Sequence, residues 1–445
     1  MTTVHALTKQ TKPYLCPLIF QKEEMTKYDV IVVGAGAAGL IAAGRAAHLG
    51  ARVLLVEKMR RAGRKLLITG KGRCNITHDA ETSVYYQNIF PSGRFLKHAF
   101  HSFFVKDILD ILHTQGVETT TERGSRVFPV SNNAGDVVNA LMRWMGTKNI
   151  DILYDSRVTR LLMDDEQFQG VEVMGPKGKQ QISASHVIIC TGGKSYPATG
   201  STGDGYELAR QAGHTINEVF PALVPLVTQQ DTAGKLQGLG LKNVKASVWV
   251  NGKKQKEEFG EVMFAHYGLT GPIILTLSRF VVEELNKKNQ VEISIDLKPA
   301  LDEQKLDNRL LRDIDAHGKK QVENIFRMWL PAKMIPVFLE ILQMDREKLC
   351  NQLGAKERRK ILLLMKDFRF TITGHPGYKE AIITAGGVST KEIQSKTMES
   401  KLTRGVYFAG EVIDLDGNTG GFNLQLAYST AWLAAESCAE KLKTV

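Results

Sequence analysis

The chain has 445 residues, of which 43% are hydrophobic, and its formal net charge is +11. This length exceeds one comfortable core, so two or three domains are expected, and the hydrophobic fraction excludes a disordered chain. No apolar run approaches the roughly 20 residues that span a bilayer, and Lys9, Lys12 and Lys22 interrupt the stretch where a signal peptide would be apolar. The sequence therefore predicts a cytoplasmic protein without membrane association.

The cysteines and the charge narrow the function further. The five cysteines are dispersed and form no CxxC pair, which predicts reduced thiols and no metal site. A net positive charge can attract nucleic acid or acidic substrates. The positive residues are spread along the chain without an aromatic and basic array of the RNA-recognition type, however, and this disfavours nucleic acid as a partner.

The N-terminal part combines a featureless segment with a nucleotide-binding pattern. Residues 1–25 show no periodicity and precede a second methionine, so they are expected to be a disordered extension. From Tyr28 to Val33 a β-branched apolar run predicts a strand, and helical spacing to Leu49 predicts the helix that follows. The turn between them consists of Gly34, Ala35, Gly36, Ala37, Ala38 and Gly39.

Each glycine of this turn has a separate predicted role. Gly34 permits the tight bend, Gly36 lets the backbone approach a pyrophosphate, and Gly39 lets the helix pack closely on the strand. The next strand, Arg52 to Val56, ends before Glu57, whose carboxylate is placed to bind the ribose hydroxyls of a dinucleotide. This strand, turn, helix and strand predict dinucleotide binding by a Rossmann-like fold.

The following glycine-rich basic loop favours FAD, because such a loop can wrap an extended flavin dinucleotide. Lys71 lies within it, and its candidate cofactor-binding residues are Lys58, Gly63, Arg64, Lys65, Thr69, Gly70, Gly72, Arg73, Cys74 and Asn75. The run EKMRRAGRKLLITGKGRCNIT resembles the signature of a bacterial flavoprotein family that includes aminoacetone oxidase and bile-acid-inducible reductases. That family is similar in its FAD domain to fumarate reductase flavoproteins.

The middle of the first half predicts helices and then a β-meander. Apolar spacing predicts helical packing over 93–116 and a helix over 136–145. Strands are expected over 152–162, 170–174, 180–184 and 186–190, in an antiparallel meander. The resemblance implies that Val158 passes the adenine and that Thr191, Gly192 and Gly193 close the last strand against the cofactor.

Two further segments raise candidates for the substrate side. Asp204 is expected to cap a helix that runs to Ala212, and Tyr196 just upstream is a candidate for facing the flavin. Residues 220–299 read as short β-rich runs, and 302–366 as charged helices. The motif GEVMFAHYGLTGP, Gly260 to Pro272, matches the resembled family and is expected to form a glycine-rich loop. It carries His266, a candidate acid or base near neutral pH.

The chain then returns to the cofactor at AIITAGGV and VYFAGEVIDLDGNTGGFNLQ, which resembles the second FAD segment of these flavoproteins. A strand over 406–409 leads to an acid placed to bind ribityl hydroxyls, and a glycine pair opens a helix whose N-terminus can face the flavin. The candidate residues are Gly410, Glu411, Gly420, Gly421, Phe422 and Asn423. The predicted FAD domain is therefore discontinuous, over 26–194 and 374–445. An inserted substrate-side domain, 195–373, is β-rich over 219–300 and helical over 301–368.

The leading hypothesis is an FAD-dependent oxidoreductase in which hydride passes between flavin N5 and a small organic substrate, by amine oxidation or enone reduction. No second dinucleotide fingerprint is visible, so NAD(P)H is expected at most as a transient electron donor. Two alternatives stay open: a flavoprotein that binds and modifies RNA, and a flavin-binding regulator without turnover. The sequence predicts no oligomeric state.

Overall fold

The computed structural model describes residues 27–443, so the predicted extension, residues 1–25, lies outside the described part. Strand β1 (Lys27–Val33) lies in the middle of a seven-stranded sheet of order β7-β2-β1-β10-β9-β8, with β19 also on β10. Its residues Val30 to Val32 are fully buried, as expected for a strand covered on both faces. Strand β1 pairs in parallel with β2 (Val53–Val56) and β10 (Gly178–Ile189). Farther out, β7 (Ile150–Leu153) pairs in parallel with β2, and β19 (Val406–Phe408) with β10.

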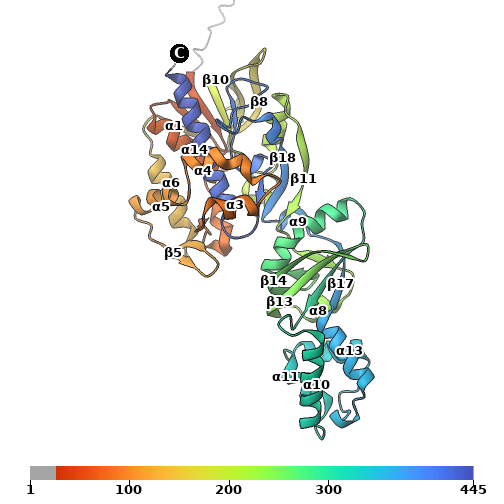
Figure 1. Cartoon of the computed structure of the whole chain (residues 1–445). Coiled ribbons are helices and arrows are strands. Elements are labelled where there is room, and N and C mark those ends of the chain that lie inside the picture. Colours follow the sequence, from red (N-terminus) through yellow and green to blue (C-terminus); the bar gives the residue numbers. More distant parts are fainter. Residues whose placement is uncertain (1–26, 444–445) are drawn as a thin grey trace, which may run out of the picture.

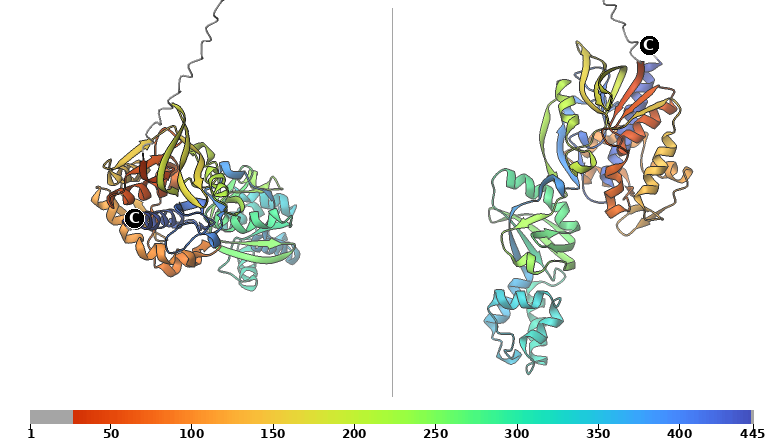
Figure 2. Two further views of the ribbon diagram at one scale, coloured as in Figure 1. Left: turned by 90° about the horizontal axis from the view of Figure 1, so that it is seen from above. Right: turned by 180° about the vertical axis from the view of Figure 1, so that it is seen from behind.

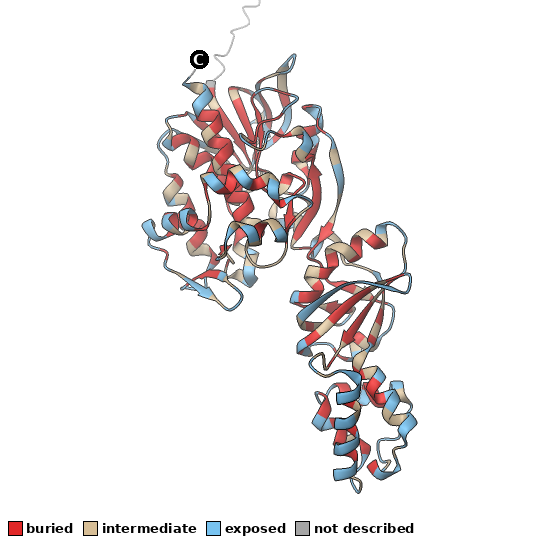
Figure 3. Ribbon diagram, viewed as in Figure 1, coloured by how far each residue is buried: buried red, intermediate tan, exposed pale blue. Residues whose placement is uncertain are grey.

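Helix α1 (Ala37–His48) and the C-terminal helix α14 (Phe422–Leu442) pack together against this sheet, with α6 (Ala134–Met145) beside them (Figure 1). Helix α1 can pack closely against α6 because α1 carries small residues at the contact. A Cβ at Gly44, for example, would lie 2.5 Å from the Trp144 ring. Helices α1 and α14, from opposite ends of the described chain, share one core with the sheet, and Figure 3 shows much of the ribbon there as buried.

Antiparallel pairing of β8 (Arg157–Asp164), β9 (Gln167–Gly175) and β10 confirms the predicted meander. The predicted strand over 152–162 is two strands, because the chain turns at Asp155, which has φ +50°. The predicted helical stretch over 93–116 also divides: its second helix starts where the Asp107 carboxylate accepts a hydrogen bond from the Phe104 N–H. The other elements of this sheet lobe are α2 (Arg64–Ile68), β3 (Thr77–His78), α3 (Thr82–Asn88), β4 (Ile89–Phe90), α4 (Lys97–Ser102), α5 (Val105–Thr114), β5 (Thr119–Glu122), β6 (Arg126–Pro129), α7 (Asp204–Gln211), β11 (Ile216–Ala222), β18 (Ile383–Val388) and β20 (Asp416–Gly417).

Between β11 and β18 the chain leaves the sheet lobe to form a closed six-stranded barrel of order β12-β15-β14-β13-β16-β17. Figures 1 and 2 show this barrel lobe as a separate body beyond β11 and β18. Its predicted β-rich stretch also contains α9 (Pro272–Asn286), a helix of 15 residues that the sequence analysis did not anticipate. The strands and the remaining helix are β12 (Leu226–Thr228), α8 (Thr232–Lys235), β13 (Gly240–Val250), β14 (Lys253–Ala265), β15 (Gly268–Thr270), β16 (Val291–Asp296) and β17 (Phe368–Gly374).

A helical lobe extends from the far end of the barrel, between β16 and β17 (Figures 1 and 2). It consists of α10 (Glu303–Ala316), α11 (Val322–Trp329), α12 (Met334–Leu342) and α13 (Ala355–Lys366). The barrel and these helices share one hydrophobic cluster, which is separate from the cluster of the sheet lobe. No helix among residues 27–443 is long and apolar enough to cross a membrane.

A buried ion pair fastens the barrel lobe to the sheet lobe. The Arg279 Nε of α9 donates to Asp416 Oδ2 of β20 at 2.8 Å, and Asp416 is only 1% exposed. The guanidinium also lies 5.1 Å from the Phe90 ring and 5.9 Å from the Phe220 ring. The other carboxylate oxygen, Oδ1, has no hydrogen-bond partner. Burial raises the pKa of Asp416 to about 6, although Arg279 opposes this shift.

This raised pKa predicts a pH-dependent stability. The protonated form is favoured in the folded chain, so the contribution of Asp416 is fully present below the ordinary aspartate pKa and is lost as the pH rises toward 6. The free energy of unfolding of the parent should fall relative to that of Asp416→Asn by about 3 kcal/mol over this window. Urea unfolding at a series of pH values measures the difference. The exposed Asp164→Asn is the control, and a constant difference between parent and Asp416→Asn would contradict the prediction.

Candidate cofactor and active site

A cavity of about 940 Å³ lies at the carboxyl ends of the parallel strands, where ligands bind in open α/β sheets. The sheet lobe supplies most of the lining of this cavity. The lining residues come from the ends of β1, β2, β10 and β19 and from the two cofactor-like segments, one in the N-terminal and one in the C-terminal part of the chain. The barrel lobe closes one side with Met263, Thr270, Gly271, Pro272 and Leu275. The cavity is therefore built jointly by segments more than 300 residues apart in the sequence.

The turn before α1 gives the three glycines distinct environments. Gly34 has φ +98° and lies against the Cys190 carbonyl, so this bend requires glycine. A Cβ on Gly39 would lie 1.7 Å from the Gly34 carbonyl oxygen, which shows how tightly helix and strand pack. At Gly36 an added Cβ would meet no protein atom within 4 Å, and the residue lines the cavity. The fold thus requires glycine at positions 34 and 39, whereas at position 36 a side chain would extend into the cavity without meeting protein atoms.

Two helix N-termini open onto this cavity without side-chain caps. Helix α1 has Gly36 as its N-cap, α14 has Gly421, and neither helix carries an acid in its first turn. Their first N–H groups therefore lack acceptors from the protein and carry the positive ends of the helix dipoles. Such termini bind phosphate and stabilise negative charge, so an extended anionic dinucleotide fits the cavity.

The acid after β2 is held by the backbone. Glu57 accepts hydrogen bonds from the Ala35 N–H at 2.7 Å and from the Met59 N–H at 2.8 Å. It lines the cavity next to Lys58, whose amine is paired with Asp204 at 2.8 Å. Asp204 was expected to cap α7, but the N-cap is Gly203 with φ +88°. The carboxylate of Asp204 binds Lys58 and Arg157 instead.

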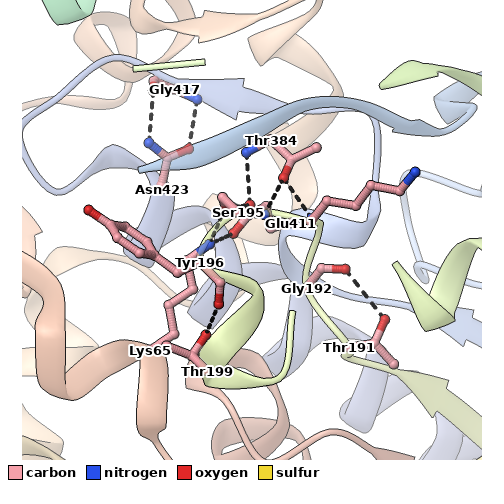
Figure 4. Close-up of polar contacts among 11 residues, drawn as sticks. Lys65, Thr191, Gly192, Ser195, Tyr196, Thr199, Thr384, Glu411, Gly417 and Asn423 are labelled. Carbon is pink, nitrogen blue, oxygen red and sulfur yellow. Dashed lines mark hydrogen bonds and ion pairs between the residues drawn. The ribbon is translucent and has the colours of Figure 1, made fainter. Parts of the chain in front are cut away.

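A polar network joins the two cofactor-like segments (Figure 4). The Lys65 amine donates to Glu411 Oε2 at 2.6 Å and to the Ser195 hydroxyl at 2.6 Å. Ser195 donates in turn to Glu411 Oε1 at 2.8 Å, and the Thr384 N–H donates to the same oxygen at 2.9 Å. The Glu411 carboxylate is thus already engaged by three donors of the protein, so it supports the cavity wall as well as facing the cavity.

Most of the predicted cofactor residues line the cavity. They are Gly34, Gly36, Ala37, Ala38, Glu57, Lys58, Gly63, Arg64, Lys65, Thr69, Gly70, Arg73, Asn75, Val158, Thr191, Gly192, Gly410, Glu411, Gly420, Gly421 and Asn423. Asn423 holds the loop before α14, since its side chain accepts from the Gly417 N–H and donates to the Gly417 carbonyl, each at 2.8 Å. The guanidinium of Arg73 is turned to the Glu122 carboxylate and the Phe128 ring.

Five predicted cofactor residues lie outside the lining, each for a local reason. Gly39 packs on Gly34, and Gly193 lies against Thr384. Cys74 is fully buried, and burial raises the pKa of its thiol to about 12. The Phe422 ring stacks on His78 with 4.3 Å between ring centroids. Gly72 has φ +87° and supports the turn of the basic loop.

Tyr196 lines the cavity and is half-buried. Its backbone is fixed by three hydrogen bonds: its N–H donates to the Tyr378 carbonyl at 2.9 Å, and its carbonyl accepts from the Thr199 N–H at 2.8 Å and from the Thr199 hydroxyl at 2.7 Å. Burial, and then the negative charge of Glu380, raise the pKa of the phenol. The hydroxyl therefore stays protonated at neutral pH, in the form that can donate a hydrogen bond.

His266 does not line the cavity. The predicted glycine-rich loop is in fact the end of β14, a tight turn, β15 and the start of α9. His266 is exposed at that turn, with its ring edge-on to Tyr267. The same motif reaches the cavity through Thr270 and Gly271 instead. The structure therefore corrects the expectation that His266 faces the substrate.

We accordingly expect His266→Ala to retain FAD and to leave the rate of flavin turnover with substrate unchanged. The reason is distance from the cavity: an exposed turn residue that does not line it has no route to the reacting proton. Anaerobic stopped-flow measurements on the variant and the parent test this. A rate loss of about 100-fold or more, typical of a removed acid or base, would return His266 to the active site.

A Rossmann sheet whose glycine turn and second helix N-terminus face one cavity defines an FAD-binding oxidoreductase. Residues 28–437 match the family described as HI0933-like protein Rossmann domain, and the chain belongs to this family. This confirms the resemblance inferred from the basic loop, and the protein is an FAD-dependent oxidoreductase.

Individual relatives match over nearly their full lengths. The chain is 29% identical over 412 residues to 3-dehydro-bile acid delta(4,6)-reductase of Clostridium scindens, covering 92% of this chain and 98% of that protein. It is 30% identical over 414 residues to ribosomal RNA dihydrouridine synthase of Escherichia coli, covering 93% and 98%. Among solved structures, the open conformation of a flavocytochrome c3 fumarate reductase is similar with a TM-score of 0.46 and 16% identity, covering 93% and 78% of the two chains.

Sequence reasoning missed Ser195, Thr384 and Arg157, although all three support the site. Ser195 and Thr384 bind Glu411, and Arg157 lines the cavity beside Asp204. Ser195 is next to the predicted Tyr196, and Thr384 lies in the segment AIITAGGV, which was assigned to the FAD domain. For Ser195 and Thr384, their positions in those segments were the available signal. Ser195 and Glu411 are 216 positions apart, whereas Thr384 and Glu411 are 27 apart and Arg157 and Asp204 are 47 apart.

Proposed function

We propose that this protein uses FAD to reduce a carbon–carbon double bond conjugated to a carbonyl group, and that its substrate is a uracil base in ribosomal RNA. The names of the two full-length relatives support the reaction class. A 3-dehydro-bile acid with delta(4,6) double bonds is a conjugated dienone, and dihydrouridine is uridine with its conjugated C5–C6 bond reduced. Both names therefore describe addition of a hydride and a proton to an activated double bond. Amine oxidation, the other reaction considered, has no support from these names.

The RNA substrate is supported by a second relative. Ribosomal RNA dihydrouridine synthase of Haemophilus influenzae is 30% identical over 417 residues, covering 93% of this chain and 99% of that protein. The spread of positive residues in the sequence disfavoured nucleic acid, but spread in sequence is a weak criterion because the fold regroups charges. A net charge of +11 fits a polyanionic partner.

The observation that carries the proposal is the pairing of a protonated phenol with apolar walls in one cavity. Tyr196 supplies the proton donor. The sheet lobe contributes Leu223, Ile382 and Ile383, and the barrel lobe contributes Met263 and Leu275. Apolar walls suit a planar conjugated ring, and they exclude water from the reacting bond.

Bound FAD would supply the hydride from its reduced ring. The protein's own part is orientation and charge. Gly34, Gly36 and the first turn of α1 would hold the dinucleotide phosphates. The α14 N-terminus would stabilise negative charge on the flavin, and the Tyr196 hydroxyl would hold the proton that the substrate carbon takes up.

The test uses ribosomal RNA from a strain that lacks the gene for this chain. The RNA is incubated anaerobically with the FAD-loaded protein and either NADH or NADPH, and its nucleosides are analysed by mass spectrometry. Formation of dihydrouridine supports the proposal, and the faster nucleotide identifies the transient electron donor. If the FAD on the protein is reduced chemically and still no dihydrouridine forms, the proposal of an RNA substrate is rejected.

A small enone is the second candidate, favoured by the 29% identity to the bile acid reductase. The experiment that distinguishes the two candidates replaces RNA with a panel of steroid enones and dienones, and amines form a further arm. The oxidation state of the flavin is followed by absorbance. Turnover of enones without dihydrouridine formation would assign the small-molecule reaction. Turnover of neither class would favour a non-catalytic flavin-binding regulator.

A further inference from the structure

The carboxylates that line the cavity are all engaged inside the protein. Glu57 accepts two backbone hydrogen bonds, Asp204 is paired with Lys58 and Arg157, and Glu411 is paired with Lys65. Asp204 and Glu411 are therefore already paired with cations, and Glu57, which keeps its charge, is held beside Ala35 at the α1 end of the cavity. Any positive charge that remains along the lining must be matched by water or by a bound anion.

Four lining cations in the described chain have no carboxylate within ion-pair distance: Arg61, Arg64, Lys71 and Arg126. Arg64 lies at the α1 end of the cavity, because the neighbouring Gly63 N–H donates to the Ala35 carbonyl at 2.8 Å. The pyrophosphate of FAD offsets positive charge at that end. Lys71 and Arg126 are both exposed and need a separate explanation.

Lys71 and Arg126 lie together at the α14 end of the cavity. Arg126 of β6 lies opposite His78 of the antiparallel neighbouring strand β3. The His78 Nδ1 atom lies 3.1 Å from the carbonyl oxygen of Gly420, which lines the cavity. Lys71 follows Gly70, whose Cβ position would be 3.2 Å from the Phe128 ring of the same strand β6. Both cations thus belong to one edge of the cavity, which we call the basic rim (Lys71 and Arg126).

The surroundings of the basic rim leave it with net positive charge. Two acids lie close to Arg126. The pKa of Glu122 is lowered first by its hydrogen bond to Arg73 and also by the charge of Arg126. Asp79 follows His78, the strand partner of Arg126, and its N–H donates to the Ser125 carbonyl at 2.7 Å, but among the described residues its carboxylate forms no ion pair with Arg126. Because Glu122 is already paired with Arg73, it cannot neutralise Arg126 as well. Arg126 uses its Nε to bind the Arg123 carbonyl at 3.3 Å, which leaves its terminal amino groups free for an acceptor.

We propose that the basic rim binds phosphate groups of the RNA strand that flank the reacting base, and so positions that base at the α14 end of the cavity. This inference rests on the proposed function for its choice of polyanion. Phosphate contacts of this kind set register and orientation without reading the base sequence. They also demand an anionic substrate, so the rim would favour RNA over a neutral enone at the same cavity.

The experiment measures binding of deproteinised ribosomal RNA to the FAD-loaded protein by filter retention over a series of salt concentrations. In the double variant Lys71→Ala with Arg126→Ala, two phosphate contacts are lost. Kd should rise, and the slope of log K against log salt should become shallower by about 1.4, at about 0.7 per contact on single-stranded RNA. The charge-matched control is Lys177→Ala with Arg404→Ala, two exposed positions that lie outside the cavity lining.

Each outcome separates this proposal from the proposed function. A shallower slope in the rim variant, with the control equal to the parent, supports the rim even if no dihydrouridine forms. An unchanged slope and Kd would overturn the rim even if the parent makes dihydrouridine. Parent protein that does not bind RNA, or a rim variant that loses its FAD, would also overturn it, since the cations would then serve no RNA or would serve the cofactor.

Discussion

Replacing Gly36 with valine is expected to give a folded protein that no longer retains FAD. Gly36 has φ −83° and ψ −162°, an extended conformation that any residue adopts, and its Cβ position is free of protein atoms. The valine side chain would therefore project into the cavity beside the first N–H groups of α1, where the phosphates are proposed to bind. The expected change is loss of flavin without loss of structure.

Flavin absorbance of the purified protein and its thermal unfolding curve measure the two parts of this prediction. Gly354→Val is the matched control, because Gly354 is also an N-cap glycine with negative φ and free space around its Cβ, but lies in the helical lobe. It should keep FAD. Gly39→Ala should instead prevent folding, since its Cβ would collide with the Gly34 carbonyl. A full complement of FAD in Gly36→Val would remove the phosphate assignment.

The sequence was informative where function depends on local spacing. The glycines at 34, 36 and 39 and the strands around them follow one another within a single supersecondary unit, so their roles could be predicted from their order. The second helix N-terminus at Gly421 was recognisable for the same reason. At Gly34 and Gly421 the physical requirement is a positive φ, and at Gly39 it is a close approach to the Gly34 carbonyl, so in these cases it applies to the residue itself.

Contacts between distant segments could not be predicted in this way. Lys65 and Glu411 are 346 positions apart, and neither residue carries a pattern that names its partner. The placement of His266 failed for a related reason. Its motif reaches the cavity, but β-strand alternation and one tight turn direct Thr270 to the cavity and leave His266 exposed. A motif locates a segment, whereas side-chain direction depends on strand register.

The pairing of charges could not be predicted from the sequence either. The sequence counts 58 lysines and arginines against 47 acids, without indicating which of them are paired. In the folded chain Lys58, Lys65 and Arg157 each meet a carboxylate at the cavity, while Lys71 and Arg126 do not. The spread of basic residues along the sequence therefore says little about the electrostatic field at a site. The unpaired cations of the lining matter more for an anionic substrate than the net charge.

Replacing Tyr196 with phenylalanine is expected to slow substrate reduction by about 10²–10⁴-fold while FAD stays bound. The phenol lines the cavity, and burial followed by the charge of Glu380 raises its pKa, so it holds its proton through the neutral range. Phenylalanine keeps the ring and its packing but has no proton to give. The loss should therefore fall on the step in which the double bond takes up hydride and proton, and reduction of the flavin by its electron donor should be unaffected.

Rapid mixing of reduced enzyme with substrate isolates that step. Tyr378→Phe is the matched control, because Tyr378 is also half-buried and has a raised pKa, but its hydroxyl donates to the Val219 carbonyl and it does not line the cavity. That variant should oxidise its flavin at the parent rate. If the rate of the parent declines at high pH because the phenol ionises, this decline should be absent from the residual rate of Tyr196→Phe, since the titrating group is gone. Equal rates of flavin oxidation in Tyr196→Phe and the parent, for every substrate the parent reduces, would show that the proton comes from another donor.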